Sequence, residues 1–151
     1  MADLLIGAAV KATDFPQAKS ASDSTTNSNI SSTSYVAGTP TVETTFVAPT
    51  SGRVLLSVGA GMRDDSGTNR VHVAPQIRQD TSGGSVVFSA DVAGRGVGSS
   101  GAAAGYEYHS RTSLLTDLDP GRTYHAQVLH KVSGGSTADI AVREIVIVPV
   151  P

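Results

Sequence analysis

The chain has 151 residues and a mass of 15.4 kDa, which fits one domain. Its formal net charge of −2 at pH 7 excludes the basic surface that nucleic-acid binding requires, and the absence of cysteine excludes disulfides, thiolate catalysis and cysteine-ligated zinc. Ser, Thr, Gly and Val supply almost half of the residues, whereas strong helix formers are scarce, so the composition favours a β-protein over a helical bundle.

The N-terminal segment lacks the features of a targeting sequence. Asp3 stands where a signal peptide would carry a basic residue, and the apolar run from Leu4 to Val10 is short, so we expect no signal peptide. No stretch of the chain approaches the roughly 20 apolar residues of a membrane helix. We therefore expect no membrane as a partner.

Residues 1–34 differ in composition from the rest of the chain. The tract from Ser20 to Ser34 consists almost wholly of Ser, Thr, Asn, Ala and Asp, and it buries too little apolar surface to offset an ordering cost of about 1–2 kcal/mol per residue. We expect residues 1–34 to form an extended arm that a neighbouring protein orders, and residues 35–151 to form the domain. The predicted apolar anchors of the arm are Leu4, Leu5, Ile6, Val10 and Phe15. Deletion of residues 1–34 should then leave a folded domain that no longer binds its partner.

From Thr41 onward, apolar and polar residues alternate in runs that are separated by clusters of Gly, Asp, Asn and Pro. This alternation predicts strands over residues 42–48, 53–62, 70–79, 85–91, 105–115, 123–132 and 138–148. Pro75 lacks the N–H that a ladder needs, which predicts a bulge or a sheet edge at this position. The last strand is apolar on both faces, as expected of a central or interface strand.

The connections between the predicted strands are rich in turn residues. We expect hairpin turns at residues 64–69, 82–84 and 133–135, and a glycine-rich loop at residues 94–101. Their predicted exposed tips are Asp64, Asp65, Asn69 and Arg95. Short strands separated by turns predict an all-β fold, an antiparallel sandwich of the jelly-roll type, with an immunoglobulin-like or fibronectin-like sandwich as the alternative.

Candidate chemistry is sparse. The side chains that titrate near neutral pH are His72, His109, His125 and His130. His125 and His130 are five residues apart on one predicted strand, so they face opposite sides and cannot share a metal without a bulge. Residues 64–69 do not match a calcium loop, and residues 94–101 lack the ending of a phosphate-binding loop. We expect that the protein is not an enzyme and has no cofactor or metal site. The remaining alternative for a metal is a trimer axis that brings together three copies of one histidine.

Four segments carry a resemblance to known families. The corner from Leu118 to Tyr124 resembles that of fibronectin-type sandwiches, in which the Tyr hydroxyl bonds back to the backbone, and also the penultimate hairpin of jelly rolls related to complement C1q and tumour necrosis factor. A resemblance to small jelly-roll structural proteins of tailed bacteriophages is carried by the segment from Thr45 to Val54, the strand from Tyr106 to Leu115, the Pro-Gly-Tyr corner and the closing strand from Ile145 to Pro149. The resemblance to this phage family covers roughly residues 41–151.

Members of that phage family are head decoration proteins, head fibres, or tail-fibre and baseplate components, often trimeric. The resemblance implies a non-enzymatic virion protein, assembled in the host cytoplasm, and we expect a homotrimeric capsid decoration protein that binds the major capsid protein through its N-terminal arm. Such a protein stabilises the assembled head by binding it in preference to free subunits. A tail-fibre or baseplate protein that binds a tail protein and contacts the host surface is the alternative. A carbohydrate-binding or adhesion module is the second alternative.

Overall fold

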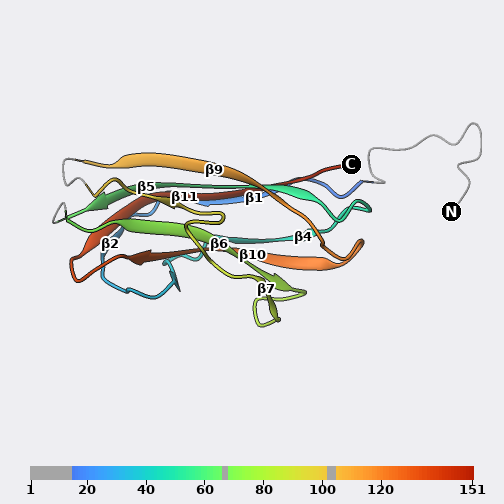
Figure 1. Cartoon of the computed structure of the whole chain (residues 1–151), viewed down its shortest axis with the longest axis horizontal. Coiled ribbons are helices and arrows are strands. Elements are labelled where there is room, and N and C mark those ends of the chain that lie inside the picture. Colours follow the sequence, from blue (N-terminus) through green and yellow to red (C-terminus); the bar gives the residue numbers. More distant parts are fainter. Residues whose placement is uncertain (1–14, 66–67, 102–104) are drawn as a thin grey trace, which may run out of the picture.

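The computed structural model describes residues 15–65, 68–101 and 105–151, which form two antiparallel sheets packed as a sandwich (Figure 1). The strands are β1 (Lys19–Asp23), β2 (Asn27–Ile30), β3 (Val36–Ala37), β4 (Glu43–Val47), β5 (Val54–Asp64), β6 (Val71–Gln79), β7 (Val86–Phe88), β8 (Val97–Gly98), β9 (Glu107–Leu115), β10 (Thr123–Val132) and β11 (Ala138–Pro149). The described residues contain no helix, and hence none long and apolar enough to cross a membrane. The predicted all-β sandwich is confirmed.

The order of the strands is that of a jelly roll. Sheet A runs β1, β11, β5, β9, with β2 also paired to β11, and sheet B runs β3, β10, β6, β7, with β4 paired to β10 and β8 to β6. The chain changes sheet from β4 to β5 and from β5 to β6, and it does so again from β9 to β10 and from β10 to β11. The immunoglobulin-like alternative is wrong, because the last two strands of that fold pair in one sheet.

Two of the three predicted hairpin turns are crossovers between the sheets. The segment after β5 leads from sheet A to β6 in sheet B, and residues 133–135 lead from β10 back to β11. Packed sheets lie about 10 Å apart, which a few extended residues span, so a short polar connection does not require the strands it joins to pair. The turn at residues 82–84 does join paired strands, β6 and β7.

The long strands match their predicted positions, whereas the short ones differ. β7 spans three residues instead of the predicted 85–91, and β8 lies inside the predicted loop 94–101. β6 pairs with β8 through its residues 72–73 and with β7 through its residues 77–78. Contrary to the predicted bulge or sheet edge, β6 is an interior strand, and Pro75 is tolerated because it lies opposite a gap between β7 and β8, where the sheet needs no donor.

The core lies between the two sheets and is built from alternate residues of the central strands. In sheet A, the inward side chains of β5 and β11 include Leu56, Val58, Ile145 and Ile147, all fully buried. β11 lies between β5 and the N-terminal strands, as predicted from its apolar character. These alternating inward positions leave the intervening residues of β5 and β11 on the outer face of the sheet.

The predicted tyrosine corner is present between β9 and β10. Tyr124 is buried, and its Oη accepts a hydrogen bond from the backbone N–H of Asp119 at 2.9 Å. The Tyr124 ring also stacks on that of Phe46, with the ring centroids 5.6 Å apart. The corner thus fixes the crossover to the start of β10 and to β4.

Residues 19–30, predicted as part of the arm, belong to the sandwich. β1 pairs with β11 from Lys19 opposite Ile147 to Asp23 opposite Arg143, and β2 pairs with the start of β11. The domain therefore begins before residue 19 and not at residue 35. Apolar burial is poor in this tract, but pairing in a sheet uses backbone N–H and C=O groups, which Ser, Thr and Asn supply as well as any residue. Deletion of residues 1–34 would remove two strands, so we no longer expect it to leave a folded domain.

Candidate functional site

The outer face of sheet A is exposed to solvent. The strand register aligns its side chains in rows that cross β9, β5 and β11. The rows are Leu114, Leu55 and Val148, then Thr112, Ser57 and Val146, then Ser110, Gly59 and Glu144. Uncharged residues predominate in these rows, and Glu144 is the one charged residue among the nine.

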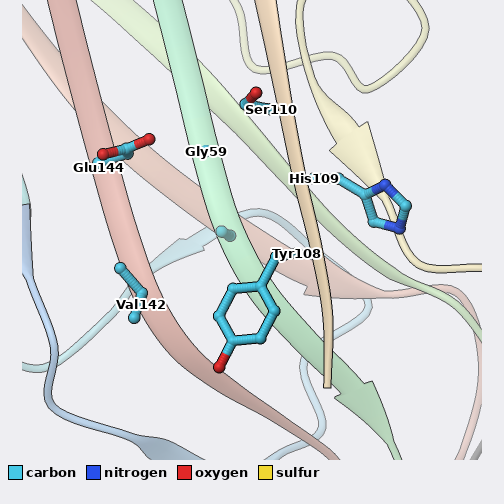
Figure 2. A pocket seen from close by; sticks show the side chains of 7 residues that line it. Gly59, Tyr108, His109, Ser110, Val142 and Glu144 are labelled. Carbon is cyan, nitrogen blue, oxygen red and sulfur yellow. The ribbon is translucent and has the colours of Figure 1, made fainter. Parts of the chain in front are cut away.

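A shallow pocket of about 230 Å³ lies on this face (Figure 2). We call it the tyrosine pocket; it is lined by Gly59, Ala60, Tyr108, His109, Ser110, Val142 and Glu144. A Cβ atom at Gly59 would lie 2.7 Å from Oε1 of Glu144, and one at Gly61 would lie 2.6 Å from Cε1 of Tyr108. The two glycines of β5 therefore let the side chains of Tyr108 and Glu144 lie directly against the backbone of that strand.

The ring of Tyr108 forms one end of the tyrosine pocket. Tyr108 is 67% exposed, and its ring centroid lies 6.5 Å from that of Tyr106 on the same side of β9. The guanidinium of Arg63 lies 5.2 Å from the centroid of the Tyr106 ring. Arg63 in turn bonds the carboxylate of Asp139 and lies 3.5 Å from that of Asp65, so its charge is already compensated.

Polar groups form the opposite end of the tyrosine pocket. Within the part of the chain that the structure describes, neither the Glu144 carboxylate nor the Ser110 hydroxyl makes a side-chain hydrogen bond or an ion pair. Figure 2 shows His109 on the other side of β9, where its Nε2 lies 3.2 Å from Oε2 of Glu107. The tyrosine pocket thus presents a ring, a free carboxylate and a hydroxyl, an arrangement suited to binding a small molecule that donates hydrogen bonds.

A second feature of the outer face is the apolar row formed by Leu55, Leu114 and Val148. These side chains are 40%, 50% and 42% exposed and lie directly opposite one another on three neighbouring strands. Phe15 lies at the same end of the sandwich, in a shallow pocket with Pro149, the residue that follows Val148. Phe15 is half exposed, whereas the other predicted anchors, Leu4, Leu5, Ile6 and Val10, lie outside the described residues.

The predicted loop tips differ in exposure. Asp64 is buried, which corrects its prediction as an exposed tip: its carboxylate accepts hydrogen bonds from the backbone N–H of Asn69 and the hydroxyl of Ser136, each at 2.9 Å. Asp64 thereby organises the crossover from β5 to β6. Asp65 is exposed, Asn69 is half-buried, and Arg95 is half-buried with its guanidinium 4.4 Å from the ring centroid of Phe88.

The four histidines do not gather into a site. His125 and His130 are both buried; Nε2 of His125 lies 3.4 Å from the carboxylate of Glu43, whereas His130 lies near Arg143. Burial, reinforced by the charge of Arg143, lowers the pKa of His130 to about 4. Burial also lowers the pKa of His72. Among the described residues, no three His, Asp or Glu side chains lie close enough together to hold a metal ion.

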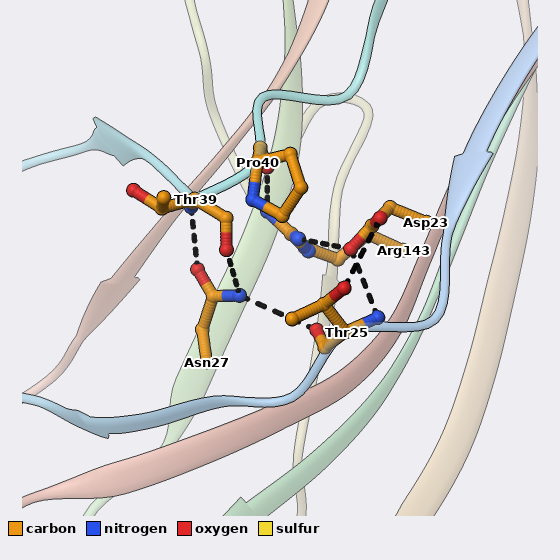
Figure 3. A network of polar contacts seen from close by, with 6 residues as sticks. All are labelled: Asp23, Thr25, Asn27, Thr39, Pro40 and Arg143. Carbon is orange, nitrogen blue, oxygen red and sulfur yellow. Dashed lines mark hydrogen bonds and ion pairs between the residues drawn. The ribbon is translucent and has the colours of Figure 1, made fainter.

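The most deeply buried charge ties the N-terminal segment to β11 (Figure 3). Arg143 is fully buried, and its guanidinium donates to the carbonyl of Pro40 and to the carboxylate of Asp23, each at 2.8 Å. The Asn27 side chain donates to the carbonyl of Thr39 at 2.8 Å and accepts from its N–H at 2.7 Å. Asp23 thus supplies the counter-ion of a buried cation, a structural role rather than a catalytic one.

Alternation along the predicted strand at residues 105–115 puts Tyr106 and Tyr108 on one face, but nothing in the sequence indicates a function for them. The feature of the sequence that could have indicated the pocket is the Tyr-x-Tyr pattern on this strand face. Glu144 could not be connected to it, because only the pairing of β5 with both β9 and β11 brings these residues to one pocket.

The sequence matches no family model and no curated protein. Among solved structures, the chain is similar to the VP2 subviral particle of infectious bursal disease virus, with a TM-score of 0.53 and 11% identity, covering 89% of this chain and 33% of that chain. It is also similar to tailspike protein 4 of bacteriophage CBA120, with a TM-score of 0.38 and 12% identity over 84% of this chain and 19% of that one. A family 35 carbohydrate-binding module from Clostridium thermocellum gives a TM-score of 0.35 and 13% identity over 86% and 96% of the two chains.

The likeness to the viral capsid structure shows the β-sandwich fold. The chain spans about one third of the length of the capsid chains it matches. A shared fold at 11% identity does not carry a function, so the function has to be argued from the surfaces of this protein.

Proposed function

We propose that the protein is a non-enzymatic structural component of a virus particle, a capsid decoration protein that binds and stabilises the assembled phage head. The observation that carries this proposal is the apolar row formed by Leu55, Leu114 and Val148. Three exposed apolar side chains side by side on neighbouring strands support a contact with another protein at this face. The partner we propose is the major capsid protein, which would bury this row.

The N-terminal segment is the second element of the proposal. Leu4, Leu5, Ile6 and Val10 precede Phe15, which lies at the same end of the sandwich as the apolar row. We propose that residues 1–14 bind the same capsid partner and so add to the contact made by the row. The resemblance to phage jelly rolls further supports a homotrimer, which a mass measurement by light scattering tests.

The experiment is a particle-binding assay with matched variants. The deletion of residues 1–14 should leave a folded sandwich because it keeps every strand of the described residues. The substitution Leu114→Lys should do so because Leu114 is half exposed. Each should lower the number of copies that co-sediment with purified heads by about tenfold, an effect typical of a central interface residue. The control is Val86→Lys, because Val86 is 41% exposed but lies on sheet B. Undiminished binding of the Leu114→Lys protein would exclude the row as the contact surface.

Copy number per particle separates decoration from the alternative. A simple ratio to the major capsid protein supports decoration, whereas far fewer copies support a tail-fibre or baseplate protein that contacts the host surface. Absence from purified particles overturns the virion proposal itself.

A further inference from the structure

We propose that the tyrosine pocket binds one ring of a neutral saccharide. This inference goes beyond the virion role and does not depend on it, because it rests on the geometry around Gly59, Tyr108, Ser110 and Glu144 alone. The apolar row proposed to contact the capsid lies two rows away along β5, so the two surfaces are tested separately.

The shape of the tyrosine pocket suits a single sugar ring. Its volume of about 230 Å³ lies just below the range of roughly 300–1,000 Å³ that is typical for drug-sized ligands. Glu144 from β11 lies against Gly59, and Tyr108 from β9 lies against Gly61, so these two side chains border the pocket (Figure 2). A sugar ring bound between them would contact both the Tyr108 ring and the Glu144 carboxylate.

The aromatic wall favours a saccharide over a strongly hydrated polar solute. The edge of the Tyr108 ring rests on Gly61, and two thirds of the residue remains exposed. An exposed ring held in place by the strand beneath it offers an apolar platform for the C–H groups of one sugar face, at little entropic cost. The Tyr106 ring is tilted by 43° from that of Tyr108 and has the Arg63 guanidinium over it, so the Tyr108 ring alone forms the platform.

The polar wall decides the charge of the ligand. The Glu144 carboxylate is exposed and has free acceptor oxygens, and Ser110 adds a hydroxyl on the other side of Gly59. This combination matches the several hydroxyl donors of a sugar. A proline-rich peptide would fit the ring but offers few donors to the carboxylate. An acidic sugar would meet the charge of Glu144, and Arg63 cannot offset it because Asp139 and Asp65 already pair with that cation.

The test is titration of the ¹⁵N-labelled full-length protein, followed by NMR, with methyl glucoside, methyl galactoside, N-acetylglucosamine and, as the charged counterpart, glucuronate. At least one neutral sugar should shift the amide signals of Gly59 and Gly61. Glucuronate should bind the protein at least tenfold more weakly than that neutral sugar does. Tyr108→Ala and Glu144→Gln should each weaken binding of the neutral sugar by about tenfold. Thr112→Ala, a small change on the same face in the next row, should leave the affinity unchanged.

The proposal is overturned if no neutral sugar shifts these amides, if glucuronate binds as well as the neutral sugars, or if Thr112→Ala weakens binding as much as Tyr108→Ala. A separate check keeps the two proposals apart. Tyr108→Ala should retain full binding to heads in the co-sedimentation assay, so a failure of sugar binding leaves the decoration proposal standing, and the reverse also holds.

Discussion

Mild acid should weaken the fold through His130. This side chain is 4% exposed on β10, and burial together with the Arg143 guanidinium lowers its pKa from 6.5 to about 4. The unfolded chain therefore takes up a proton near pH 6.5 that the folded protein takes up only near pH 4. Because the folded pKa is depressed, the stabilisation is complete above pH 6.5 and is lost as the pH falls from 6.5 towards 4.

The size of the effect follows from the shift in pKa. A displacement from 6.5 to about 4 corresponds to about 3 kcal/mol of unfolding free energy. About 2 kcal/mol of this is lost between pH 7 and pH 5, where the unfolded histidine becomes protonated and the folded one stays neutral. The carboxylates with lowered pKa values, Asp80 and Glu107, titrate below this window and do not obscure it.

The assay is urea unfolding at pH 7 and pH 5, followed by circular dichroism and tyrosine fluorescence, because the chain contains no tryptophan. His130→Leu should lose about 2 kcal/mol less stability between the two pH values than the wild type does. His109→Leu is the matched control, since His109 is half exposed and lies outside the core, and it should behave as the wild type does. His72, whose pKa is also lowered, contributes equally to all three proteins. The reasoning is refuted if His130→Leu and the wild type lose the same stability.

Two further substitutions test the turns and the buried charge. Gly84→Ala should cost about 2 kcal/mol or more, because the added Cβ would lie 1.7 Å from the carbonyl oxygen of Gln79. The control is Gly83→Ala in the same turn, where the atom nearest to the added Cβ is Oγ1 of Thr81 at 4.0 Å. The melting temperature of this variant should lie within a degree or two of that of the wild type. Asp23→Asn should cost about 3 kcal/mol in urea unfolding, because it leaves the Arg143 guanidinium buried without a counter-ion. An unchanged unfolding midpoint for Asp23→Asn would show that the carbonyl of Pro40 alone satisfies this cation.

A local sequence pattern predicts only part of the candidate site. Alternation along residues 105–115 correctly put Tyr106 and Tyr108 on one face, because side chains of a strand alternate whatever the strand pairs with. The tyrosine pocket, however, needs Glu144 from another strand, and only the register of β5 with β9 and β11 aligns Glu144 with Gly59 and Ser110. The pairing that creates the pocket depends on contacts between residues far apart in the sequence, which no window of neighbouring residues encodes.

The loop residues illustrate the same difference. Asp64 has the character of a turn residue, and its position after a strand indicated an exposed tip. Its burial follows from the crossover between sheets, which brings Ser136 from the far end of the chain to its carboxylate. A polar side chain is buried where the fold supplies hydrogen-bond partners, and those partners are not visible in the local sequence.

The sequence by itself determined the all-β class, the long strands of the sandwich and the tyrosine corner. Each depends on a local rule: the period of two along a strand, the preference of turn residues, or a hydrogen bond across five residues. The tertiary structure alone decided that the Ser-rich tract joins sheet A, that two supposed hairpins cross between sheets, and which side chains share the outer face. These features depend on which strands pair, and pairing is selected by the burial of whole faces and the satisfaction of backbone groups over the entire domain.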